Sequence, residues 1–468
     1  MGTSETAEFE RVLDMRLVLS IVAAGAMTFS GILVETAMNV TFPTLMREFG
    51  VSTSTVQWVT TGYLLVLAII IPTSSYLDRR FRKRTLFAAS VLLFLAGTAL
   101  GACAPSFGAL ALARLVQGAG TGIAWPLMNN IIVEQAPLEK RGMLMGVAVL
   151  ISVLPPALGP AYGGFLSTHF NWRLIFAALI PLLVAALVLG MLTIRSPQPA
   201  QTGRFQLGQF VLLAGSLTCL IVSTSCGADL GWTSLPVTGA LVAAVLLGTC
   251  FCLASMRSER PLVDVRIFKR RTFSFSILGL LCIQAVILGY GFLIPNFAQV
   301  VSGQTAFAAG CVLVPGCFLG AVLSPVSGHL LDRIGPRIPI MAGSVFAVVS
   351  ALLFTVFYRQ AGLIGLAAIY IVFIVGQTLS LSNIQTNGLS CLPPDKTADG
   401  TATTTASAQL GSALGTSLAA GLVEGAQQSS ADLAMATSLG TGYGFIACIV
   451  IACLMAVAYA LATEHARP

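Results

Sequence analysis

The chain has 468 residues, of which 56% are hydrophobic and 9% are charged, and its formal net charge is +7. Soluble globular proteins carry about 25% charged residues, so this composition excludes a soluble enzyme, a nucleic-acid-binding protein and a secreted disulfide-rich protein. The basic residues lie between apolar runs rather than in one patch, so they indicate orientation in a membrane and not an acidic partner.

Apolar runs of about 18 to 26 residues recur along the chain, each long enough to cross a hydrocarbon core of about 30 Å. The first run is too long for the apolar region of a signal peptide, so we predict that it is a retained span. We predict fourteen membrane-spanning helices, which start near Leu17, Thr55, Thr85, Phe107, Gly142, Arg173, Leu207, Pro236, Phe273, Thr305, Ile338, Leu363, Thr401 and Thr441.

The basic residues predict the orientation of these helices. When alternate loops are placed on the same side, most of the 25 Lys and Arg residues fall on the side of the two termini, whereas Arg47, Arg173 and Arg359 fall on the other side. Because cytoplasmic loops carry the excess of Lys and Arg, we expect both termini in the cytoplasm and the protein in the plasma (inner) membrane.

A repeated loop divides the chain into two halves. The segment at 75–84, SYLDRRFRKR, recurs at 328–337 as GHLLDRIGPR, as expected for two six-helix halves with an extra helix pair between them. We therefore predict a cytoplasmic N-terminus (1–16), a six-helix bundle (17–195), two extra helices with cytoplasmic linkers (196–272), a second six-helix bundle (273–462) and a cytoplasmic tail (463–468).

Four motifs accompany the repeat: LVETAMNVTFP at 33–43, VQWVTTGY at 56–63, RLVQGAG at 114–120 and ALGPAYGG at 157–164. With them the sequence resembles the major facilitator superfamily, and within it the fourteen-span drug:proton antiporters that include lincomycin and quaternary-ammonium exporters. The resemblance implies an all-α integral membrane fold of two six-helix bundles plus two extra helices, which transports by alternating access.

The loop after the second helix departs from the family pattern Gly-x-Leu-Ala-Asp-Arg-x-Gly-Arg. Ser75 replaces the first Gly, Arg79 takes the Asp position and Asp78 lies one place early, whereas the second copy keeps Asp332 and Arg333. All four charged residues are candidate gating residues, and we expect the latch between the halves to depend more on Asp332 and Arg333 than on Asp78 and Arg79.

Glu35 is an acid well inside a predicted span with apolar sequence on both sides. A carboxylate in hydrocarbon costs about 2.5 kcal/mol or more unless it is paired, hydrated or protonated, so we predict that Glu35 takes up and releases a proton. Arg114 lies at a matching depth in the fourth helix, and the resemblance implies that it assists this proton transfer. Two alternatives stay open: a carboxylate fixed permanently to Arg114, and an arginine that only ties helices together.

Gly159, Pro160, Gly163 and Gly164 in the fifth helix remove side-chain bulk and a backbone donor, so a kink or a close helix crossing should follow. The resemblance assigns this motif to gating; ordinary tight packing is equally compatible with it.

Polar and aromatic residues on the remaining helices are candidates for substrate binding. Any one of them could instead be a hydrogen bond between helices, worth about 0.6 kcal/mol on average. The predicted substrate residues are Asn39, Gln117, Trp125, Asn129, Tyr290, Asn296, Asn383 and Asn387.

These residues predict a transporter and no enzyme, because the three His residues are scattered and no GxxxxGK loop occurs. A single buried acid suits a proton better than sodium, so we predict a proton-coupled multidrug efflux antiporter that exports lipophilic, in some cases cationic, small molecules. It would use the proton gradient without cofactor or metal, contact membrane lipid, bind no nucleic acid and act as a monomer. The alternatives are a dedicated exporter of an endogenous metabolite, peptide or lipid, and a receptor or scaffold that has lost transport.

Overall fold

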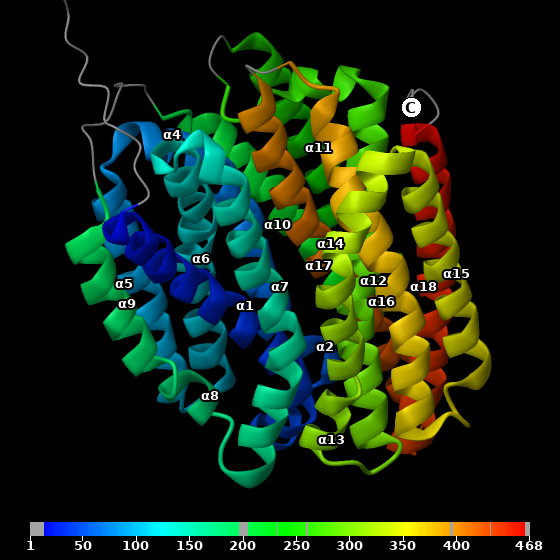
Figure 1. Cartoon of the computed structure of the whole chain (residues 1–468). Coiled ribbons are helices and arrows are strands. Elements are labelled where there is room, and N and C mark those ends of the chain that lie inside the picture. The colour runs from blue at the N-terminus through cyan, green and yellow to red at the C-terminus, as the bar shows by residue number, and fades with distance from the viewer. Residues whose placement is uncertain are drawn as a thin grey trace, which may run out of the picture.

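The computed structural model describes residues 14–195, 205–231, 233–258, 261–393, 396–430 and 432–463. These residues form long helices and no β-strand (Figure 1). No water is available in hydrocarbon to bond free peptide groups, so apolar runs of this length fold as helices that bond their own backbone.

The N-terminal half contains six spans. The second is built from α2 to α4, which follow one another almost without interruption, and the sixth from α8 and α9. The elements of the N-terminal half are α1 (Met15–Phe49), α2 (Thr53–Val56), α3 (Trp58–Ile70), η1 (Ile71–Thr73), α4 (Ser74–Arg80), α5 (Lys83–Ala102), α6 (Phe107–Gln135), α7 (Leu138–His169), α8 (Leu174–Ala177) and α9 (Ile180–Thr193).

The extra pair consists of α10 (Leu207–Leu230) and α11 (Leu235–Arg257), and the short helix η2 (Val265–Lys269) leads to the second half. α10 packs against α17 of the C-terminal half and also touches α3. Ser417 lies where the three parts meet, because its hydroxyl is 3.0 Å from that of Ser225 and 3.5 Å from that of Thr61. The extra pair therefore lies against the junction between the two halves.

The linker before the second half is fixed by Asp264, a buried residue at the start of η2. Its carboxylate accepts from the backbone N–H of Arg266 at 3.0 Å and from Lys396 Nζ at 2.5 Å. Burial opposes ionisation of this carboxyl, but the hydrogen bond and charge of Lys396 hold its pKa below the ordinary value. The linker is thereby joined to the start of α17.

The C-terminal half contains the other six spans. Its elements are α12 (Arg271–Val300), α13 (Ala306–Cys311), α14 (Val314–Ile334), α15 (Arg337–Phe357), α16 (Gly362–Ser390), α17 (Thr397–Gln428) and α18 (Leu433–Thr463). Within the described residues, fourteen long helices, in two sets of six plus an extra pair, confirm the predicted fold class. Twelve of these are long and apolar enough to cross a membrane, and α7 and α17 complete the fourteen.

The predicted helix starts lie close to the observed ones, apart from the last helix, which begins at Leu433 and not at Thr441. The early part of α18 is rich in Thr, Ser and Gly. Gly440 packs so closely on α17 that an added Cβ would lie 2.6 Å from the Cα of Val423. Because this face contacts protein and not lipid, it lacks the hydropathy by which a span is recognised.

The two copies of the repeated loop end their helices differently. Gly335 follows α14 with φ +75°, a conformation that favours glycine. After α4 the chain is extended at Phe81, and Arg82 stands where the family has its second glycine. Asp78 pairs with Lys83 of the same loop at 3.1 Å, so part of the basic cluster is neutralised locally.

Candidate functional site

Arg114 is completely buried in the N-terminal half, and three groups hold its guanidinium. Nε donates to the carbonyl oxygen of Val59 at 2.9 Å, and Nη1 donates to Gln117 Oε1 at 2.8 Å. The guanidinium carbon lies 4.1 Å from the centre of the Tyr63 ring, a cation–π contact. Nη2 is buried and has no hydrogen-bond partner among the described residues, so this nitrogen is still available as a donor.

Glycines allow the helices around Arg114 to approach. A Cβ at Gly118 of α6 would lie 2.9 Å from the Tyr63 carbonyl oxygen on α3, and one at Gly97 of α5 would lie 2.7 Å from Gln117 Cγ. Both distances are too short for a real side chain. The close approach brings the backbone of α3 within reach of an arginine seven residues into α6.

Glu35 lies on α1 with 6% of its surface exposed. The face of α1 that carries Glu35 lies against Tyr63, whose ring stacks on the Arg114 guanidinium, so the structure brings the two residues to one site. Among the described residues, no nitrogen of Arg114 lies within 4.0 Å of a Glu35 carboxylate oxygen, so the two form no ion pair. The alternative of a permanent Glu35–Arg114 ion pair is therefore not what the structure shows.

Tyr63 was not among the predicted site residues, although it ends one of the motifs. Its hydroxyl is fully buried and lies toward α1: a Cβ at Gly31 would be 3.1 Å from it and 2.7 Å from Thr121 Oγ1. Gly31 precedes Glu35 by about one helical turn. Tyr63 therefore connects the Arg114 guanidinium with the face of α1 that carries the acid.

The other predicted residues of the N-terminal half differ in their surroundings. Gln117 uses its amide to donate to Thr98 Oγ1 at 2.9 Å and to accept from Arg114, so it supports the arginine and offers little to a substrate. Asn39 accepts from Thr60 at 2.7 Å and lies beside Gly291 of the other half. Trp125 and Asn129 are half-buried.

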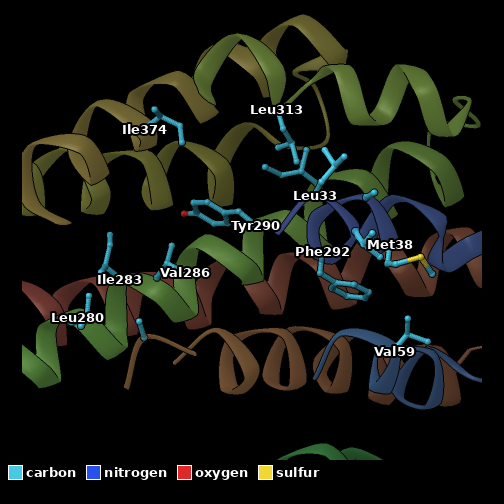
Figure 2. Packing of buried hydrophobic residues seen from close by; sticks show 14 of the residues in the cluster. Leu33, Met38, Val59, Leu280, Ile283, Val286, Tyr290, Phe292, Leu313 and Ile374 are labelled. Atoms are coloured by element: carbon cyan, nitrogen blue, oxygen red, sulfur yellow. The ribbon is translucent and has the colours of Figure 1, made fainter. Parts of the chain in front are cut away.

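Tyr290 lies in the core of the C-terminal half and has no exposed surface. The centre of its ring is 4.9 Å from that of Phe354, 4.8 Å from that of Phe373 and 5.9 Å from that of Phe445. Figure 2 shows that Tyr290 and Phe292, two residues apart on α12, point in different directions. In this structure Tyr290 therefore packs among aromatic rings, and its role in substrate binding stays a prediction.

The three predicted asparagines of the C-terminal half are buried. Asn383 donates to Ser327 Oγ of α14 at 3.1 Å, and Asn387 donates to the Ala462 carbonyl of α18 at 3.3 Å. Both hydrogen bonds join neighbouring helices, which is the role given above as the alternative to substrate binding. Asn296 has an amide nitrogen without a hydrogen-bond partner among the described residues, so it keeps a group for a ligand.

The glycine motif of α7 packs against both halves. A Cβ at Gly163 would lie 2.8 Å from the Cα of Ala37 on α1, whereas one at the neighbouring Gly164 would lie 2.7 Å from the Cα of Phe307 on α13. Gly159 faces Thr36 of α1 in the same way, and Gly310 of α13 faces Pro160. α7 is thus pressed between a helix of its own half and a helix of the other.

The predicted gating residues of the repeated loops are only partly described. Asp78 pairs with Lys83, and Arg333 is exposed. The side chains of Arg79 and Asp332 lie outside the described part of the structure.

One end of the helix bundle, which we term the distal end, contains α2, α8 and α13 (Figure 1). Several hydrogen bonds join the two halves there: Gln299 Nε2 donates to the Val40 carbonyl at 2.9 Å, and the backbone N–H of Phe307 donates to Thr168 Oγ1 at 3.1 Å. Glu424 of α17 joins the same interface. It was not among the predicted site residues, because it lies four residues from its helix end beside polar sequence.

The family model named Major Facilitator Superfamily matches residues 24–416. The chain belongs to this superfamily. Major facilitator proteins are transporters and not enzymes, and this membership confirms the resemblance seen in the four motifs.

Some curated relatives are named as drug-resistance proteins. The lincomycin resistance protein LmrB of Bacillus subtilis is 32% identical over 82% of this chain and 80% of its own length. The multidrug resistance protein B homolog of Mycobacterium tuberculosis is 32% identical over 66% of this chain and 57% of its own length. Among solved structures, an inward-facing, unoccupied bacterial homologue of the human lysosomal transporter Spinster has a TM-score of 0.70 at 17% identity, covering 96% of this chain and 98% of that one.

Proposed function

We propose that this facilitator is a proton-coupled exporter of lipophilic small molecules, some of them cationic, with Glu35 as its protonation site. The observation that carries the proposal is the arrangement around Glu35. Glu35 is buried on the face of α1 that lies against Tyr63, and Val59, Gln117 and Tyr63 already hold the Arg114 guanidinium. A carboxyl group that is buried but not locked in an ion pair can bind and release a proton as its surroundings change.

The direction and the substrate class rest on two further supports. The excess of Lys and Arg on the side of the termini supports cytoplasmic termini in a plasma membrane, which makes the distal end the outer end. The names of the relatives, lincomycin resistance protein and multidrug resistance protein, support export of drugs. The hydrogen bonds between the halves at the distal end agree with a carrier whose outer end is closed.

The test uses inverted vesicles with a pH-sensitive dye and a panel that contains lincomycin and a quaternary ammonium compound. In the wild type, addition of a transported compound should release protons from the acid interior. Glu35→Gln keeps the size of the side chain but cannot ionise, so it should abolish gradient-driven transport and change substrate binding by less than about tenfold, or 1.4 kcal/mol.

Asp432→Asn is the matched control, because Asp432 is an exposed acid before α18. It should transport at the wild-type rate. Full gradient-driven transport by Glu35→Gln would remove Glu35 from the mechanism, and substrate transport without proton movement in the wild type would reject proton coupling.

A further inference from the structure

The carboxylate of Glu424 crosses from one half of the protein to the other. Glu424 is a residue of α17 with 8% of its surface exposed. Its Oε2 accepts from the backbone N–H of Thr53 at 2.8 Å and from that of Ser54 at 3.3 Å. Thr53 and Ser54 are the first two residues of α2, so an acid of the C-terminal half binds the start of the second span of the N-terminal half.

These two N–H groups need an acceptor from outside their own helix. The first N–H groups of a helix have no partner within it. The residue before α2, Ser52, accepts from the N–H of Thr55 at 3.3 Å. Glu424 provides for the two donors that precede Thr55, and hydrogen bonds to an ionised acceptor are stronger than those between neutral groups.

A second side chain of α17 holds the same residue. Thr53 Oγ1 donates to Gln427 Oε1 at 2.7 Å, and Gln427 Nε2 donates to Thr437 Oγ1 of α18 at 2.7 Å. Glu424 and Gln427 are three residues apart and so lie on neighbouring positions of one helix face. Thr53 is thus bound through its backbone and its hydroxyl, and α18 keeps the amide in place.

Glu48, a second acid near the distal end, acts differently. Glu48 accepts from Trp172 Nε1 at 2.6 Å and pairs with Arg173 at 2.7 Å. These three residues all belong to the N-terminal half, so Glu48 ties that half to itself. Among the described hydrogen bonds that join the two halves, Glu424 provides the charged ones.

We propose that Glu424 is a positioning residue of the transport cycle, which holds the distal ends of the two halves together by binding the start of α2. Alternating access requires the distal ends to separate and rejoin. The contact must then break in every cycle, because its donors and its acceptor belong to different halves. The proposal rests on transport by alternating access and is independent of which drug or ion is moved.

The experiment is hydrogen exchange of the full-length protein in lipid nanodiscs, read by mass spectrometry on the peptide that covers 52–57. Glu424→Leu should accelerate exchange in this peptide by about tenfold, since its amides would open about 1.4 kcal/mol more easily. The peptide around Phe307, whose N–H bonds across the same interface to Thr168, should also exchange at least about twofold faster, because the two halves separate there together. The peptide around Arg266, whose N–H bonds to Asp264 within the linker, should keep its exchange rate within about twofold of the wild type.

Three further variants separate the parts of the contact. Glu424→Gln keeps an acceptor oxygen, so its exchange rate at 52–57 should lie between those of the wild type and Glu424→Leu. Thr53→Val removes the hydroxyl bond to Gln427 but keeps the N–H bond to Glu424, so it should change exchange less than Glu424→Leu. Glu424→Asp is a milder replacement if Glu424→Leu does not accumulate, and its shorter side chain should again raise exchange.

Unchanged exchange at 52–57 in both Glu424→Leu and Glu424→Asp would overturn the proposal. Faster exchange at 52–57 alone would also overturn it, because Glu424 would then only complete the start of α2. Faster exchange in the linker peptide as well would overturn it too, because it would indicate general loss of structure. Exchange does not depend on a transported compound. If the Glu424 variants show the predicted acceleration but the wild type moves no protons, the role of Glu424 stands and proton coupling is rejected. If the wild type moves protons but exchange at 52–57 is unchanged in the variants, proton coupling stands and the role of Glu424 is rejected.

Discussion

The two halves of the protein bury different chemistry. The N-terminal half encloses a carboxylate and a guanidinium, Glu35 and Arg114, whereas the C-terminal half encloses the aromatic rings around Tyr290. A buried charge needs polar partners, and the N-terminal half supplies them through a backbone carbonyl and an amide that glycines bring close. Rings need only close packing. The comparison teaches that one fold built from similar halves can pair an acid with an arginine inside one of them, while a buried acid of the other half, Glu424, lies at the interface between them.

The largest effect should come from the guanidinium. Arg114→Lys keeps the charge but loses the planar group that bonds Val59 and Gln117 while it stacks on Tyr63. We expect transport to fall by at least about tenfold, with the protein still inserted in the membrane, because Lys cannot form this set of contacts at once. Uptake into inverted vesicles at matched protein amounts measures it.

Arg359→Lys is the control in the C-terminal half. Arg359 is exposed and donates to the hydroxyl of its neighbour Tyr358, so its replacement should leave transport unchanged. Equal losses in both variants would break the contrast between the halves.

The next effect concerns the helix that contacts both halves. Gly163→Ala adds a Cβ only 2.8 Å from the Cα of Ala37, which cannot move without shifting α1. We expect a loss of transport or of folded protein equivalent to about 1–3 kcal/mol, measured by transport and by thermal unfolding in detergent. Gly425→Ala meets nothing within 4 Å and should behave as the wild type. A harmless Gly163→Ala would show that α7 is not held tightly.

The repeated loops provide a comparison between equivalent positions. Asp78 is paired with Lys83 inside its own loop, whereas Asp332 occupies the acidic position of the family pattern. We expect Asp332→Asn to reduce transport by about tenfold and Asp78→Asn by less, since the partly buried Asp78–Lys83 pair lies within one loop of one half. Transport at matched expression decides, and a larger loss from Asp78→Asn would assign the latch to the first loop.

The smallest effect is expected in the aromatic cluster. The Tyr290 hydroxyl is buried and has no hydrogen-bond partner among the described residues. Tyr290→Phe removes the hydroxyl and keeps the ring contacts, so the free energy of unfolding should change by less than about 1 kcal/mol. The transport rate should stay close to that of the wild type. Tyr290→Ala should lower stability by about 3–5 kcal/mol through loss of packing. A strong loss of transport in Tyr290→Phe would show that the hydroxyl binds substrate.

Sequence alone was sufficient for the membrane class, the two halves and nearly all helix starts, because a span must be apolar over a fixed length. It also singled out Glu35 and Arg114, because charged residues are rare inside apolar runs. The late start expected for α18 was wrong, since a helix face that packs on protein need not be apolar.

Tertiary structure decided which side chains meet. The stacking of Arg114 on Tyr63, the use of Gln117 to support that arginine and the burial of Tyr290 depend on which helix faces lie together. Glu424 shows the same limit, because its partners are 370 and 371 residues away in the chain. Local periodicity reports how polar a helix face is, but the partner across an interface is fixed only when the helices pack.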